Sequence, residues 1–173
     1  AGLHHGPAFI QGLVHPFTGL DHLVAMLMVG IWSALAFREE RRALWAAPAA
    51  FASLLLVGGL LGFAGARLPG VETMIAASLL ALGAMVGLNL KLPAPLGAAI
   101  VGAFALFHGF AHGAELPAGG LFAGYAAGFV VTTALLHAAG LGLGRAMADL
   151  QVRVWQALGG AVGLTGLVLL ARG

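Results

Sequence analysis

Long apolar segments interrupted by isolated charges constrain the fold of this chain more than any other feature. Of its 173 residues, 61% are hydrophobic and 8% are charged, whereas a typical soluble domain carries about 25% charged residues. The chain therefore has too few polar side chains to cover its own surface, and lipid must surround most of it. This pattern predicts an integral membrane protein whose main partner is the lipid bilayer.

The charged residues divide the chain into six segments, each close to the roughly 20 residues that a helix needs to cross the hydrocarbon core. Only helices and closed barrels satisfy their backbone in lipid, and no barrel-like alternation is present. We therefore expect an all-α protein with a single transmembrane domain over residues 1–173. The predicted helices are 16–37, 44–66, 73–90, 92–114, 118–144 and 154–171, after an external N-terminal tail at 1–15.

The positive charges predict an orientation for these helices. Six of the eight Lys and Arg residues lie in the loops after the first, third and fifth predicted helices. The positive-inside rule places those loops in the cytoplasm, which puts the N-terminus outside. A signal peptide removed before Ala1 would agree with this orientation. Recurrent glycines four residues apart favour close helix packing, and they could also form an interface between copies of the chain.

The composition also excludes several classes of protein. The formal net charge of +2 comes from charged residues in the loops and does not indicate a nucleic-acid-binding patch. The chain has no cysteine, which excludes disulfides and thiolate metal sites. It has no Walker A sequence either, so it cannot by itself drive a process with ATP.

The first polar motif, "HPFTGLDHLVAML" at residues 15–27, lies in the stretch "LVHPFTGLDHLVAML" at 13–27. The residue before a proline avoids helical dihedral angles, so we expect His15 just outside the first membrane helix. Asp21 and His22 then lie about two turns below the outer surface and point about 100° apart. They can flank one site, or one side chain can hold the partner of the other.

The second motif is "FHGFAHGAE" at 107–115. His108, His112 and Glu115 follow an i, i+4, i+7 spacing, which puts all three on one helical face. The fourth predicted helix runs from inside to outside, so this motif reaches the same outer leaflet as the first. We therefore predict a metal site between helices one and four; a buried hydrogen-bond network joining the two helices is the alternative.

Other polar or sulfur-bearing residues are secondary candidates, as metal ligands or relay groups. The histidines near the N-terminus also fit a loose tail, the glutamate also fits a helix N-terminus, and the methionines also fit plain packing. The histidine in the fifth helix lies in the inner half, where Thr133 could be its hydrogen-bond partner. These candidates are His4, His5, Met26, Met28, Glu72 and His137.

Imidazole and carboxylate ligands without thiolate suit a divalent transition metal such as Ni, Co or Zn, and also Fe or Mn. Three functions compete for such a site: a metal transporter, an intramembrane metal-dependent hydrolase, and a structural or sensing protein. In the hydrolase, His22, His108 and His112 would hold the metal and Asp21 or Glu115 would act as the base. No obvious carbonyl-polarising group lies beside the motifs, and no soluble domain is attached to relay a signal.

The sequences "HPFTGLDHLVAM" at 15–26 and "FHGFAHGAE" at 107–115 resemble the two signature motifs of the HupE/UreJ family of nickel/cobalt permeases. The resemblance extends to six hydrophobic helices and to "TTALLHAAG" at 132–140. It implies uptake of Ni²⁺ or Co²⁺, as transported substrate, across the bacterial inner membrane from a periplasmic N-terminal side. The metal would supply hydrogenase, urease or cobalamin synthesis, and no organic cofactor is implied. Carried over, the metal residues are His15, Asp21, His22, His108, His112 and Glu115.

Overall fold

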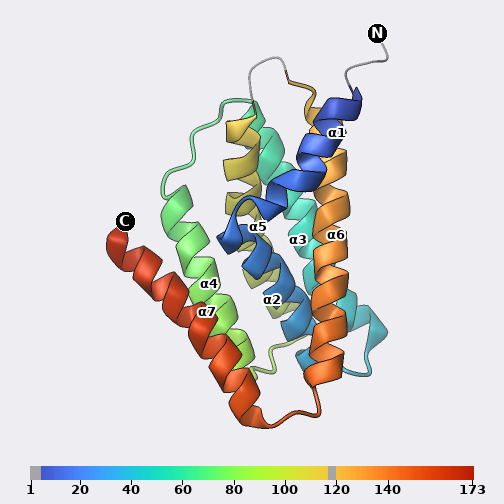
Figure 1. Ribbon diagram of the computed structural model, residues 1–173, viewed down its shortest axis with the longest axis vertical. Helices are drawn as coiled ribbons and strands as arrows, with labels where there is room; N and C mark the ends of the chain where they lie inside the picture. Colours follow the sequence, from blue (N-terminus) through green and yellow to red (C-terminus); the bar gives the residue numbers. More distant parts are fainter. Residues whose placement is uncertain (1–4, 117–119) are drawn as a thin grey trace.

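The structure is a computed structural model that describes residues 5–116 and 120–173, and its described part is helical without strands. His4 and Pro117 lie outside the described residues. The helices pack into an elongated bundle (Figure 1). In chain order the elements are α1 (His5–Val14), the 3₁₀ helix η1 (His15–Phe17), α2 (Leu20–Ala36), α3 (Arg41–Phe63), α4 (Val71–Gly87), α5 (Ala94–Glu115), α6 (Phe122–Met147) and α7 (Val152–Arg172).

Four helices, α3, α5, α6 and α7, are long and apolar enough to cross a membrane. The segment Pro7–Phe17 and helix α2 meet the same criterion together, although they are bent by 80°. Helix α4 is apolar but has 17 residues. The chain is thus an all-helical membrane protein, as predicted, with four to five candidate spans by length and composition where the sequence predicted six.

The N-terminal region differs from its predicted form. Residues 1–15 were expected to be a tail, but residues 5–14 form helix α1, and α2 begins at Leu20 instead of continuing from Pro16. The reason is packing, because α1 lies against α6, where a side chain at Gly12 would collide with the carbonyl of Tyr125. Pro16 is buried in the 3₁₀ turn, and Gly19 is extended, which separates the two helices.

The most extensive helix contacts are those of α3 with α5, α4 with α7, α2 with α6, and α1 with α6. The contact of α3 with α5 positions the second motif. A Cβ atom at Gly109 would collide with the Leu55 carbonyl, and one at Gly113 with the Gly59 carbonyl. Because both glycines let the backbones touch, the neighbouring His108 and His112 lie in the core of the bundle.

The loop between α4 and α5 lies near the end of the bundle opposite this motif, toward the bottom of Figure 1. The indole N–H of Trp32 donates to the Leu90 carbonyl at 3.0 Å. The Lys91 ammonium donates to the Leu35 carbonyl, at the last turn of α2. Burial and the nearby Arg38 guanidinium lower the pKa of Lys91.

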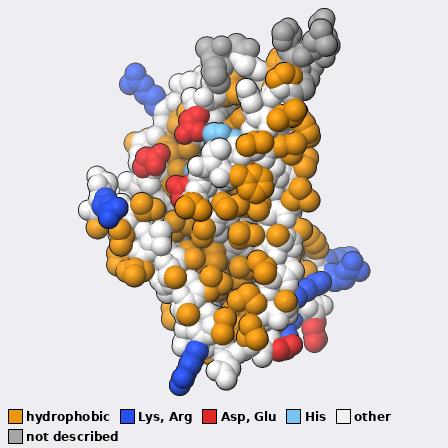
Figure 2. Space-filling view, viewed as in Figure 1, with side chains coloured by type: hydrophobic (Ala, Val, Ile, Leu, Met, Phe, Trp, Pro, Cys, Tyr) orange, Lys and Arg blue, Asp and Glu red, His pale blue; other side chains and the backbone are white. Residues whose placement is uncertain are grey.

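The middle of the bundle is apolar inside and outside. Trp32, Phe51 and Met26 are among the largest fully buried side chains. On the outer surface, Leu135 and Leu164 are among many exposed large hydrophobic residues. Figure 2 shows hydrophobic side chains over most of the visible face, with charged groups toward its ends and left edge. This distribution suits a bundle surrounded by lipid.

Candidate metal site

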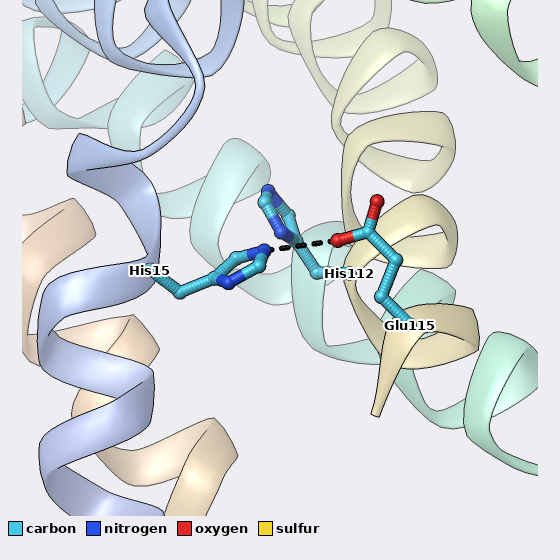
Figure 3. A group of neighbouring side chains, drawn as sticks. All are labelled: His15, His112 and Glu115. Atoms are coloured by element: carbon cyan, nitrogen blue, oxygen red, sulfur yellow. Dashed lines mark hydrogen bonds and ion pairs between the residues drawn. The ribbon is translucent and has the colours of Figure 1, made fainter. Parts of the chain in front are cut away.

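The two polar motifs, about ninety residues apart in sequence, meet at one end of the bundle. His15 in η1 and Glu115 at the end of α5 are linked by a contact of 3.0 Å between Nε2 and Oε2. The ring of His15 lies edge-on to that of His112, with the centroids 4.5 Å apart. Figure 3 shows the three side chains converging from the two segments.

His15, His112 and Glu115 each offer one ligand atom, and these atoms lie within 4.8 Å of one another. Among the described residues, they form the one group of three or more such side chains that meets this condition. Two ligand atoms bonded to one ion at about 2.2 Å lie at most about 4.4 Å apart. A small rotation of these side chains would therefore allow one ion to contact all three.

His22 and His108 continue the cluster inward. The His22 ring centroid lies 4.1 Å from that of His112 and 4.6 Å from that of His108. The Nδ1 atoms of His22 and His108 are 3.0 Å apart. The other ring nitrogen of His108, Nε2, lies 2.8 Å from the hydroxyl of Ser78 on α4.

The hydrogen bonds fix how protons are distributed over neutral imidazoles. The Ser78 hydroxyl donates to the Ile75 carbonyl at 2.6 Å, so His108 Nε2–H must donate to Ser78 Oγ. His108 Nδ1 is then an acceptor, and His22 Nδ1–H donates to it. This arrangement leaves the lone pair of His22 Nε2 available for an ion.

Asp21 contacts His22 rather than lying apart from it. Its Oδ1 accepts the backbone N–H of His22 at 2.8 Å and lies 3.4 Å from His22 Nδ1. Asp21 also lines a cavity of about 350 Å³ together with Glu72 and Arg172. Glu72, in the first turn of α4, therefore borders the approach to Asp21 instead of joining the histidines.

His112 is the least satisfied polar side chain in the cluster. It is 3% exposed, and neither Nδ1 nor Nε2 has a hydrogen-bond partner. A buried polar group left without a partner costs about 1–3 kcal/mol. Its ring is also fixed in place, since it packs against the rings of His15, His22 and Phe129. The site thus holds a buried imidazole ready to bind a ligand.

A cavity of about 470 Å³ connects this cluster with the surface and is lined in part by His15, Thr18, Glu115 and Tyr125. The side chains become less exposed along the cluster, from 63% for Glu115 and 27% for His15 to 0% for His108. On the upper part of the face in Figure 2, red carboxylate groups lie to the left of the pale blue histidine. The cluster therefore runs from an acidic mouth into the protein.

The secondary candidates lie elsewhere. His4 is outside the described residues, and His5 begins α1. Met26, Met28 and His137 are buried deeper in the bundle. The expected hydrogen bond between Thr133 and His137 is absent, and that prediction is wrong. The Thr133 hydroxyl donates instead to the Phe129 carbonyl of its own helix at 2.8 Å, a common alternative for threonine in helices.

Sequence reasoning missed Ser78 and Phe51. Ser78 is fully buried and contacts His108; the only signal in the sequence is a hydroxyl within an apolar helix. Phe51, on α3, packs against the rings of His108 and His137. Nothing in its sequence context separates it from other apolar core residues.

The fold and the site together define a multi-pass helical membrane protein with a histidine and carboxylate cluster leading inward from one end. The chain belongs to the HupE/UreJ family, since the family model described as "HupE / UreJ protein" matches residues 1–169. It is 43% identical over 171 residues to "Protein HupE" of Rhizobium leguminosarum bv. viciae. The aligned region covers 96% of this chain and 86% of that protein. No solved structure matches the chain significantly.

Proposed function

We propose that this protein is a permease that takes up Ni²⁺ or Co²⁺, binding the ion at the cluster and passing it inward between the helices. The observation that carries the proposal is His112, a buried imidazole without a partner, next to His15 and Glu115. The role in nickel or cobalt transport is the one that membership of the HupE/UreJ family suggests. Imidazole and carboxylate ligands suit these late divalent ions.

The residues of the cluster have different proposed roles from the mouth inward. Glu115 and His15 capture the ion at the mouth, where the carboxylate attracts a cation. His112 and His22 then supply nitrogen ligands in the buried part. Asp21 orients His22, and Glu72 gathers cations near Asp21. The proposed metal-site residues are those predicted from the sequence, with His108 acting through its hydrogen bond to His22 rather than as a ligand: His15, Asp21, His22, His108, His112 and Glu115.

The proposed topology has six crossings in one domain, with the N-terminal side and the cluster facing the periplasm across the bacterial inner membrane. Helix α4 and the bent pair of α1 and α2 would supply the two crossings that do not meet the length criterion as single helices. The arginines and the lysine at the opposite end support this orientation. The imported metal would serve hydrogenase, urease or cobalamin synthesis, and oligomers remain compatible with the small-residue helix faces.

An intramembrane hydrolase using the same residues is not favoured. Such an enzyme needs an open water position on the metal and a group that assists attack on a polarised substrate carbonyl. No observation in the described residues points to such a substrate, and the family is one of metal transporters.

Uptake of radioactive ⁶³Ni²⁺ into proteoliposomes tests the proposed function. Wild-type protein should take up the ion, and His112→Ala should lower uptake by about tenfold or more, as expected for loss of a metal ligand or its support. Ser53→Ala is the matched control, because Ser53 is exposed and its hydroxyl bonds only within α3. Wild-type uptake by His112→Ala, or no uptake by the wild type, would contradict the proposal.

A further inference from the structure

Two buried polar atoms further from the mouth than the cluster have no hydrogen-bond partner. Among the described residues, the buried side-chain nitrogen and oxygen atoms without a hydrogen bond are those of His112, the Nε2 of His137 and the Oγ of Ser33. His137 is 2% exposed and Ser33 is fully buried. The nitrogen of His137 is therefore a second unsatisfied imidazole, outside the cluster already described.

The helix positions give the depth of His137 in two independent ways. On α6, His137 follows Phe129, whose ring contacts His112 with centroids 4.4 Å apart; eight residues span about 12 Å of helix. On α2, Gly30 follows His22 by the same interval and packs against the His137 carbonyl. Both estimates place His137 about 12 Å further from the mouth than His112 and His22.

The side chains of His108 and His137 lean toward each other. In a helix the Cα–Cβ bond tilts toward the N-terminus, and α5 and α6 run in opposite directions (Figure 1). The His108 side chain therefore leans away from the mouth and the His137 side chain toward it. The Phe51 ring separates them, with centroids 6.0 Å from His108 and 5.1 Å from His137.

The thioether of Met26 lies at a depth between the cluster and His137. The Sδ atom of Met26 is 3.7 Å from the hydroxyl of Thr133. Met26 is one turn before Gly30 on α2, and Thr133 is one turn before His137 on α6. An imidazole and a thioether on facing helices form a donor pair that suits a late divalent transition metal rather than a hard cation such as Mg²⁺.

We propose that His137 Nε2 and Met26 Sδ form an inner metal-binding position, which receives the ion from His22 past the ring of Phe51. This inference rests on the proposed transport function and adds a second ion-binding position to it. A divalent ion is prohibitively costly in an apolar interior without ligands. The inner position divides the apolar path into shorter steps, and Ser33 Oγ offers an oxygen ligand one turn beyond Gly30 on α2.

Packing alone gives a different account of His137. Its ring meets the Phe51 ring at 85°, as an N–H group directed at an aromatic face would. In that case His137 would only fill space beside Phe51, and a metal ion would never reach it. The two accounts differ in whether an ion contacts the side chain at position 137.

The absence of cysteine from the chain provides a direct probe of this contact. His137→Cys introduces a single thiol, and a cobalt–thiolate bond gives a charge-transfer absorption band in the near ultraviolet. Titration of Co²⁺ into the purified full-length variant should produce this band. Leu135→Cys is the matched control on the same helix, because Leu135 is 63% exposed on the lipid-facing surface; it should give no band.

Transport gives the second readout. His137→Ser should lower Co²⁺ uptake into proteoliposomes by about tenfold or more, whereas His137→Cys, which keeps a ligand, should retain it. Both variants should keep the thermal stabilisation that Co²⁺ gives the wild type through the outer cluster. A missing band in His137→Cys, wild-type uptake by His137→Ser, or loss of the Co²⁺ stabilisation in His137→Ser would each overturn the inner position.

These outcomes are separable from failure of the proposed function. If the wild type takes up neither Co²⁺ nor Ni²⁺, the transport proposal fails, and the inner position fails with it. If the wild type transports Co²⁺ but His137→Cys gives no band, only the inner position fails, and the ion crosses the bundle by another route.

Discussion

Ser78 should control the metal affinity of the cluster although its side chain does not bind the ion. In Ser78→Ala, His108 Nε2–H loses its acceptor, which lies 2.8 Å away in the wild type. The metal-free protein can relax if the His108 proton moves to Nδ1. His22 Nδ1 must then accept that proton's hydrogen bond, so His22 Nε2 carries a proton and can no longer bind the metal.

The size of this effect follows from the lost hydrogen bond. To bind the metal, the variant must return the proton to His108 Nε2, where it has no acceptor. Leaving a buried donor unsatisfied costs about 1–3 kcal/mol, and the free energy of metal binding is weakened by that amount. Because about 1.4 kcal/mol corresponds to a tenfold change in Kd, Ni²⁺ affinity should fall by about 5- to 140-fold.

Isothermal titration of Ni²⁺ into purified Ser78→Ala and wild type measures this change. Ser53→Ala is the matched control, because the Ser53 hydroxyl also donates to a carbonyl of its own helix, that of Ala49 at 2.7 Å, but is exposed. Its affinity should equal that of the wild type. If Ser78→Ala also binds Ni²⁺ with wild-type affinity, the proton arrangement deduced for His108 and His22 is wrong.

Three further predictions concern the same site and its support. Metal affinity should fall with falling pH, because protons compete with the ion for imidazole nitrogen; binding that does not change with pH would argue against histidine ligands. Gly109→Ala should lower the free energy of unfolding by about 1–3 kcal/mol, because its methyl group meets the Leu55 carbonyl. Gly142→Ala, where nothing lies within 4 Å, should be neutral or stabilising in thermal unfolding. Glu115→Gln should raise the KM for Ni²⁺ more than it lowers the maximal uptake rate, since it removes the charged partner of His15 at the mouth; an unchanged KM would contradict a capture role.

Much of the fold follows from the apolar pattern. Charges and apolar length predict α3, α5, α6 and α7 with ends within four residues of those observed. Helix α1 could not be predicted in this way, because ten residues are too few to span a membrane and its packing on α6 depends on tertiary contacts. The 80° bend between α1 and α2 has the same origin.

The site was predictable where local spacing and topology agree. The i, i+4, i+7 spacing of His108, His112 and Glu115, with the opposite directions of the two helices, predicts that the motifs meet, and His15 does contact Glu115. That these residues bind a metal stays a prediction. Ser78 was not predictable, because its contact with His108 depends on the register between α4 and α5, which no sequence pattern encodes.

Anomalous diffraction at the nickel absorption edge, from crystals soaked in Ni²⁺, tests the central claim most directly. The proposed site predicts an anomalous peak between His15, His112 and Glu115, within bonding distance of at least two of these side chains, and no such peak in His112→Ala crystals. A peak only at other residues, or no bound nickel in wild-type crystals at saturating Ni²⁺, would contradict a metal site at this cluster.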